Sequence, residues 1–293
     1  MRRTMLFLPG NSPNMIVNGG FLGIDRIILD LEDAVSPDQK DAARELTAET
    51  LRCMKFPGCQ VIVRMNGMDT PYWREDLERI LPGRPDFLMP PKVGDGEEIK
   101  ELDRMMGEME EKHGIKKGSI GLIPLIETAR GVENSYRIAC SSGRIEGLFL
   151  GAEDLTSDLR CARTKKGDEI AYARSRILYA ARAAGVEAYD SPFTDVEDME
   201  GLRRDTELAK SLGFSGKAAV NPRQVECINE VFSPTQQEID YARDVVAAAE
   251  AAAAEGKGVI SLRGKMIDAP ILNRAKTVLQ MARALGMKEG EET

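Results

Sequence analysis

The chain has 293 residues, of which 42% are hydrophobic, and its formal net charge is −8 at pH 7. These values are typical of a soluble enzyme, and the negative charge argues against a surface that binds nucleic acid. The single histidine, His113, lies in a charged stretch, so catalysis by Ser-His-Asp or Cys-His and zinc sites with several histidines are excluded. We therefore expect chemistry that uses carboxylates, arginine, lysine and a hard metal ion.

Short apolar runs recur along the chain, and most are separated by segments of helical character. The runs span residues 4–9, 25–33, 60–67, 86–92, 120–127, 145–154, 186–193 and 214–222. Because they are continuous rather than alternating, they are typical of strands buried on both faces. Of the segments between them, 36–54 opens with Ser36-Pro37, a helix start, and 167–185 ends on Gly185, a helix stop.

This repeated alternation predicts an α/β fold, a (β/α)8 TIM barrel built on a closed parallel sheet. An open, doubly wound sheet is the alternative. We favour the barrel because there are eight runs and because the chain has no glycine-rich dinucleotide fingerprint.

The pattern changes near residue 231. We expect a catalytic barrel domain over 1–231 and a C-terminal helical tail over 232–293 that acts as a lid. The tail opens with a long alanine-rich helix, 233–256, and ends with a second helix that stops near Gly286. At this length we expect no independent core in the tail.

The cysteines and the N-terminus indicate the compartment. The chain has five cysteines, an odd number, and no CxxC pair, so we expect reduced thiols. The first apolar run stops at Pro9, too early for a signal peptide or a membrane span. We therefore expect a cytoplasmic protein that does not contact a membrane.

Two carboxylates end neighbouring apolar runs. Glu127 ends the run that begins at residue 120, and Asp154 ends the run that begins at residue 145. A carboxylate at the end of a buried strand is costly unless something compensates it. Because the carboxyl ends of barrel strands face the active site, the two should meet there, and oxygen ligands suit Mg²⁺. The sequence predicts that Glu127 and Asp154 bind one Mg²⁺ ion.

Other charged or polar side chains also follow the runs. They are Asp30, Glu32, Asp33, Arg64, Lys92, Asp190 and Asn221. A ring of such residues on one face favours a functional interpretation, most strongly for Arg64, which we expect to serve the chemistry rather than the fold. Helix capping or support of other residues explains Asp30, Glu32 and Asp33 equally well, and Lys217 could be a structural ion-pair partner.

Seven segments together carry a family resemblance. They are 2–11, 30–35, 63–67, 124–131, 150–155, 216–225 and 263–270. They resemble the citrate lyase β-subunit family, within the Mg²⁺-dependent HpcH/HpaI-type acyl-CoA lyases that include malyl-CoA and citramalyl-CoA lyases. The resemblance implies a TIM barrel in homotrimers, hexamers or other oligomers, with Mg²⁺ on Glu127 and Asp154. It also implies substrate contacts from Arg64 and Glu127, and a catalytic acid, Asp268, that reaches a neighbouring subunit.

The resemblance further implies a reaction and its partners. The family cleaves a citryl thioester, as citryl-CoA or bound to an acyl carrier protein, to an acetyl thioester and oxaloacetate. The implied partners are the α subunit and the γ, or acyl-carrier, subunit of citrate lyase. In this reaction Arg64 would stabilise the developing enolate or bind a substrate carboxylate, and Asp268 would carry a proton.

Several alternatives stay open at this point. The substrate could be a malyl or citramalyl thioester, or the enzyme could be a class I aldolase with a Schiff base on Lys92 or Lys217. A non-catalytic partner that kept the fold is a third reading. Arg2 and Arg3 could bind the nucleotide-like tail of the carrier near the first βα loop or simply form a basic terminus. Asp268 precedes Pro270 by two residues, so it could instead cap a helix.

Overall fold

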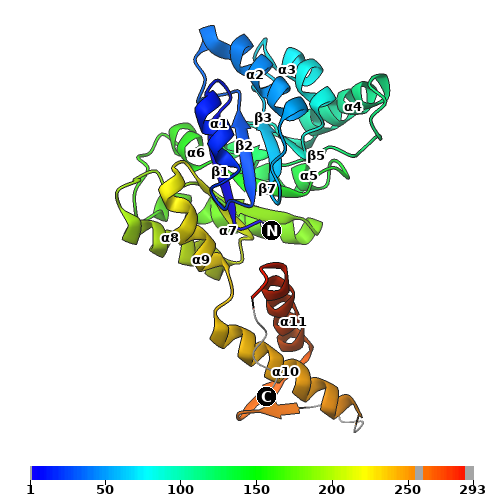
Figure 1. Ribbon diagram of the computed structural model, residues 1–293. Helices are drawn as coiled ribbons and strands as arrows, with labels where there is room; N and C mark the ends of the chain where they lie inside the picture. The colour runs from blue at the N-terminus through cyan, green and yellow to red at the C-terminus, as the bar shows by residue number, and fades with distance from the viewer. Residues whose placement is uncertain (1, 255–259, 288–293) are drawn as a thin grey trace. The chain divides into compact units, whose positions relative to one another are not determined.

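The computed structural model describes residues 2–254 and 260–287 (Figure 1). The described residues divide into two compact units, one over Arg2–Asn229 and the other from Glu230 onward. Each unit is built around its own group of buried side chains.

The first unit contains a parallel sheet of nine strands among the described residues, in the order β5-β4-β3-β2-β1-β9-β8-β7-β6. The strands are β1 (Thr4–Pro9), β2 (Arg26–Asp30), β3 (Gln60–Arg64), β4 (Phe87–Met89), β5 (Gly121–Leu122), β6 (Leu125–Ile126), β7 (Gly147–Leu150), β8 (Glu187–Asp190) and β9 (Gly216–Ala219). Each predicted apolar run contains one of these strands or, in one case, two.

The exception is the fifth run, which Pro124 divides into β5 and β6. Proline has no amide N–H, so it cannot continue the ladder of hydrogen bonds. β5 pairs with β4, and β6 pairs with β7. The two ends of the sheet are therefore halves of one run, and the sheet closes, which confirms the predicted TIM-barrel fold.

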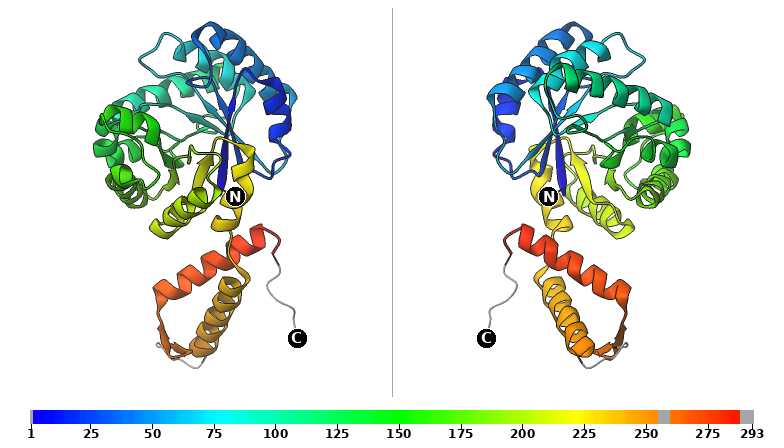
Figure 2. Two further views of the ribbon diagram at one scale, coloured as in Figure 1. Left: turned by 90° about the vertical axis from the view of Figure 1, so that its left-hand side faces the viewer. Right: turned by 90° about the vertical axis from the view of Figure 1, so that its right-hand side faces the viewer.

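Helices follow the strands and lie outside the sheet, as both views of Figure 2 show. They are α1 (Pro13–Gly19), α2 (Lys40–Cys53), α3 (Trp73–Ile80), α4 (Gly96–Lys112), α5 (Ala129–Ala139), α6 (Ala152–Asp158), α7 (Ala171–Ala184), α8 (Met199–Leu212) and α9 (Val225–Phe232). Short 3₁₀ turns are η1 (Pro37–Gln39), η2 (Leu81–Gly83), η3 (Asp168–Ile170) and η4 (Pro222–Gln224). The predicted helix stop at Gly185 is confirmed, because this residue ends α7 in a left-handed conformation.

Side chains from successive strands fill the interior of the barrel. The buried cluster consists of Met5, Ile28, Ile62, Met89, Ile123, Leu125, Phe149, Tyr189 and Ala218. The interior is thus a packed core, and we expect a ligand to bind at the loops that follow the carboxyl ends of the strands.

The second unit contains α10 (Gln236–Ala254), a hairpin of β10 (Ile260–Leu262) and β11 (Lys265–Ile267), and α11 (Ala269–Ala284). Its buried residues are Ile239, Ala242, Val245, Ile267, Ala275, Leu279 and Ala282. The expectation that the tail lacks a core was wrong, because the hairpin lets the apolar faces of the two helices pack together.

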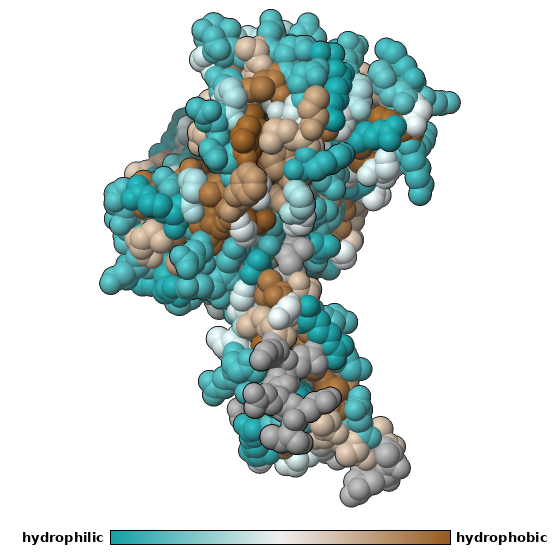
Figure 3. Space-filling model, viewed as in Figure 1, coloured by the Kyte–Doolittle hydropathy of each residue, from teal (hydrophilic) through white to brown (hydrophobic). Residues whose placement is uncertain are grey.

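Hydrophilic side chains cover much of the face of the barrel unit that Figure 3 shows, with apolar ones gathered in smaller patches. In the described parts of the chain, no helix is both long enough and apolar enough to cross a membrane.

Candidate active site

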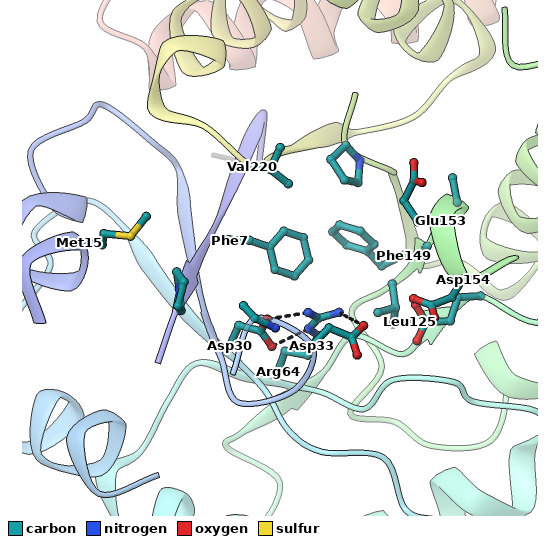
Figure 4. Close-up of a pocket in the computed structure, with 16 residues that line it drawn as sticks. Phe7, Met15, Asp30, Asp33, Arg64, Leu125, Phe149, Glu153, Asp154 and Val220 are labelled. Carbon is teal, nitrogen blue, oxygen red and sulfur yellow. Dashed lines mark hydrogen bonds and ion pairs between the residues drawn. The ribbon is translucent and has the colours of Figure 1, made fainter. Parts of the chain in front are cut away.

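A pocket of about 330 Å³ opens at the carboxyl ends of the barrel strands (Figure 4). Its lining includes Phe7, Pro9, Asp30, Asp33, Arg64, Glu127, Phe149, Gly151, Glu153, Asp154, Pro192 and Val220. The structure thus brings Arg64, Glu127 and Asp154 to one pocket, although they are far apart in the sequence.

Arg64, at the end of β3, is held by Asp30, at the end of β2. Its Nε lies 2.7 Å from Asp30 Oδ1, and its Nη2 lies 2.6 Å from Asp30 Oδ2. The guanidinium carbon lies 5.0 Å from the ring centre of Phe7. Burial opposes the charge of Arg64, but the hydrogen bonds and attraction of Asp30 outweigh it and raise the pKa. Arg64 is therefore a fixed cation in the pocket wall.

Asp30 has a structural role that the sequence left open. It is fully buried, and its carboxylate also accepts the backbone N–H groups of Glu32 (2.9 Å) and Ala34 (3.1 Å). Its neighbour Lys40, which sequence reasoning missed, donates from Nζ to the carbonyl oxygens of Leu31 and Glu32 at 2.7 Å each. In the sequence, Lys40 is only a lysine in the first turn of a predicted helix, and such a position does not predict a contact with the loop after β2.

Glu127 lies just beyond β6 and is only 1% exposed. Its Oε1 accepts the backbone N–H of Lys92 at 2.8 Å. Burial, then the negative charges of Glu32 and Asp154, raise the pKa of Glu127 well above its ordinary value. A side chain at Gly151 would come within 2.5 Å of Glu127 Oε2, so only glycine leaves room for this carboxylate. Glu127 is an under-compensated buried acid, which calls for a cation.

Asp154 is in the first turn of α6, directly after β7, and its side chain is 38% exposed. Its Oδ1 lies 3.9 Å from the ammonium of Lys92, which also contacts Glu32 Oε1 at 2.8 Å and Asp33 Oδ1 at 3.8 Å. This part of the pocket therefore already attracts a cation.

The donor set of the pocket fits Mg²⁺. Glu127 and Asp154 offer carboxylate oxygens, the ligand type that Mg²⁺ prefers, and two protein ligands leave positions for substrate and water. Within 2–254 and 260–287, no three His, Cys, Asp or Glu side chains form a ready-made metal cluster. The fit therefore rests on the chemistry of the two carboxylates and the raised pKa of Glu127.

The predicted ring of functional residues does not extend to Asp190 or Asn221, and Lys217 is a structural ion-pair partner, as one interpretation of the sequence held. Lys217 is fully buried, and its Nζ lies 2.6 Å from both Asp190 Oδ2 and Asp205 Oδ2. Burial disfavours the Asp190 carboxylate, but Lys217 and Arg174 outweigh it and lower its pKa. Asn221 caps η4 by accepting the backbone N–H of Arg223 at 3.0 Å. These residues stabilise the fold.

Lys217→Met should therefore destabilise the protein by about 3–5 kcal/mol, since Arg174 alone would then face the two buried carboxylates of Asp190 and Asp205. Urea unfolding monitored by circular dichroism would measure this. A stability within about 0.5 kcal/mol of wild type would show that the ion pairs are dispensable.

Neither lysine suits the Schiff-base alternative. Lys217 is held in its buried ion pairs. At Lys92, burial opposes the charge, but Glu32 outweighs it and raises the pKa, so the amine stays protonated. A protonated amine is not a nucleophile.

Arg2 and Arg3 lie at the amino end of β1, whereas the pocket lies at its carboxyl end. Arg2 pairs with Glu146 at 2.9 Å and with Glu187 at 2.6 Å, and Arg3 pairs with Asp25 at 2.9 Å. The hypothesis that they bind a carrier at the first βα loop was wrong.

Asp268 is in the second unit and caps α11. Its Oδ1 accepts the backbone N–H of Ile271 at 3.0 Å. The capping interpretation is therefore seen in the structure, and a role for Asp268 in the chemistry stays a proposal.

Comparison with known proteins shows the family. Residues 3–222 match the family described as HpcH/HpaI aldolase/citrate lyase. The chain belongs to this family. Residues 170–287 also match a family of carbon–carbon bond lyases of the TIM-barrel fold.

Relatives that match this HpcH/HpaI family member over nearly its whole length are named as lyases or lyase subunits. Citrate lyase subunit beta from Leuconostoc mesenteroides subsp. cremoris is 42% identical, with 99% of this chain and 96% of that protein covered. The L-malyl-CoA/beta-methylmalyl-CoA lyase of Rhodobacter capsulatus is 33% identical, with 96% and 95% covered. The protein is a carbon–carbon lyase.

One similar solved structure is CitE from Mycobacterium tuberculosis in complex with magnesium, acetoacetate and coenzyme A. Its TM-score is 0.78 and its identity 31%, with 96% of this chain and 98% of that chain covered.

Proposed function

We propose that this lyase cleaves a citryl thioester, citryl-CoA or citryl-acyl carrier protein, to an acetyl thioester and oxaloacetate with Mg²⁺. The observation that carries the proposal is the meeting of Glu127 and Asp154 with Arg64 in one pocket. The names of the relatives that are 38–42% identical support the citryl substrate. A neighbour that holds magnesium and coenzyme A supports the cofactor and the thioester class.

In this proposal Glu127 and Asp154 hold Mg²⁺, and Glu127 also contacts the substrate. When bound, the ion supplies a Lewis acid that orients and acidifies the substrate hydroxyl group. Glu127 is held in place because it is buried and because its Oε1 accepts the backbone N–H of Lys92 at 2.8 Å. The carboxylate geometry thus depends little on solvent-exposed side chains.

Arg64 supplies hydrogen-bond donors on the same side of the pocket. Nε and one hydrogen of Nη2 are committed to Asp30, and Nη1 lies 3.1 Å from Glu32 Oε2. Each terminal nitrogen carries two hydrogens, so one on each remains for a substrate oxygen. Such donors stabilise a developing enolate or bind a carboxylate, and they cost no reorganisation because Asp30 already fixes them.

The reaction must move one proton twice. The C3 hydroxyl loses its proton and becomes a ketone as the carbon–carbon bond breaks. The electron pair leaves as the enolate of the acetyl thioester, which then takes a proton on carbon. We assign both transfers to Asp268, whose carboxylate takes the hydroxyl proton and then gives it to the enolate carbon, with residues 232–293 acting as a lid on a neighbouring subunit in a trimer or hexamer.

Complementation tests the assignment of Asp268. Asp268→Asn and Glu127→Gln, each inactive alone, should regain partial activity when they are assembled together, because some mixed sites hold both intact residues. The measurement is turnover after co-expression with two affinity tags. Purified mixed oligomers without recovered turnover would contradict a shared site.

A substrate panel tests the proposed reaction. The purified chain is given citryl-, malyl- or citramalyl-CoA with Mg²⁺, and oxaloacetate, glyoxylate and pyruvate are measured. We expect oxaloacetate from citryl-CoA and its loss with EDTA. Faster release of glyoxylate or pyruvate would assign the malyl or citramalyl alternative instead. Assays that add the citrate lyase α and acyl-carrier subunits test whether the thioester is carrier-bound.

A further inference from the structure

The ammonium of Lys92 lies among carboxylates of the candidate metal site. It is 2.8 Å from Glu32 Oε1, 3.8 Å from Asp33 Oδ1 and 3.9 Å from Asp154 Oδ1. Asp154 is one of the two proposed metal ligands. A monovalent cation of the protein itself thus stands next to the place that a divalent ion would take.

The backbone of Lys92 is fixed independently of its side chain. Its φ of 54° is left-handed, which is uncommon for a residue other than glycine, asparagine or aspartate. Its amide N–H donates to Glu127 Oε1 at 2.8 Å. A strained conformation of this kind persists only where the surroundings hold it. The backbone therefore serves Glu127, the other proposed ligand, wherever the ammonium goes.

The side chain of Lys92 can leave, whereas Arg64, another cation near these acids, cannot. The Lys92 side chain is 37% exposed and has solvent beside it. The Arg64 side chain is 10% exposed and makes two hydrogen bonds to the fully buried Asp30. A divalent ion that enters the cluster can displace the lysine at little cost, but displacing the arginine would leave Asp30 buried and unpaired.

We propose that Lys92 is an internal counter-cation that a divalent ion must displace, so that this positioning residue weakens metal binding to Glu127 and Asp154. The inference rests on the proposed function, because it takes these two residues as the metal ligands. The ammonium weakens metal binding because like charges repel. A positive group within a few ångströms of a metal ion repels the ion, and the effective dielectric constant near the protein surface screens this repulsion only in part.

Calorimetric titration of the metal-free, full-length protein with Mg²⁺, and separately with Mn²⁺, tests the inference. Lys92→Met should bind both ions more tightly than wild type, by about tenfold. Lys92→Arg, which keeps the charge, should stay within about threefold of wild type. Lys100→Met is the matched control: it removes a positive charge from a surface pair with Glu97 on α4 and should leave the affinity unchanged.

Tighter binding is a result that structural damage cannot produce, since misfolding only weakens a site. Lys92→Gln keeps a donor for Glu32 and serves if Lys92→Met does not fold. It should also bind metal more tightly. Equal or weaker binding by the folded variant would overturn the inference.

Two further variants distinguish an error in the proposed role of Lys92 from an error in the proposed metal site. Glu127→Gln and Asp154→Asn should both lose affinity for Mg²⁺. If they do while the Lys92 variants match wild type, only the role of Lys92 is wrong. If neither loses affinity, the ion does not bind these carboxylates and the proposed metal site itself is wrong.

Discussion

Glu127→Gln is expected to lower turnover at least about 100-fold while raising the melting temperature of the metal-free protein. Glutamine has the same shape and keeps an oxygen to accept the Lys92 N–H, but it cannot be ionised. Since burial and the nearby acids raise the pKa of Glu127, its negative charge destabilises the metal-free fold. Function and stability therefore oppose each other at this residue.

Thermal unfolding with and without Mg²⁺, together with turnover, checks this result. Wild type should gain stability from Mg²⁺, and the variant should not. Glu110→Gln is the matched control. Glu110 is also fully buried but pairs with Arg144 at 2.6 Å, outside the pocket. It should lose stability and keep turnover per folded molecule. The same pattern at Glu127 would contradict its role as a metal ligand.

Arg64→Ala is expected to abolish turnover and also to destabilise the protein by about 3–5 kcal/mol. The sequence suggested that Arg64 serves the chemistry alone. The structure shows that its removal would leave Asp30, which is fully buried, without the guanidinium that it pairs with. Arg64→Lys should keep the charge but lose the paired geometry, so it should recover part of the stability and little turnover.

The double variant Arg64→Ala with Asp30→Asn separates the two effects. Because no buried charge is left unpaired, it should regain much of the stability lost by Arg64→Ala, measured by urea unfolding. Its turnover should stay as low as that of the single variant. Recovered turnover would contradict the role of the guanidinium in the reaction.

The sequence predicted the barrel well because apolar runs report burial directly. It did not predict that the fifth run would be divided, because the effect of Pro124 depends on the strands on either side. The helix predicted over 36–54 begins later than expected, because the segment from Pro37 to Gln39 is a 3₁₀ turn and α2 begins at Lys40.

The candidate site was predicted only in part, because a strand-end charge does not reveal its partner. Arg64 and Asp190 each end a strand, yet Arg64 lines the pocket and Asp190 is buried in the fold. The difference comes from Arg174 and Asp205 on α7 and α8, which complete the ion pairs around Lys217 and Asp190. Such contacts between distant helices leave no local signal.

Glu127 and Asp154 should share one divalent ion, and anomalous diffraction from crystals grown with Mn²⁺ would test this most directly. We expect one strong anomalous peak in the pocket, within about 2.5 Å of a carboxylate oxygen of both residues. A peak bound by other residues, or a fully loaded protein with no peak between these two, would contradict a shared metal site.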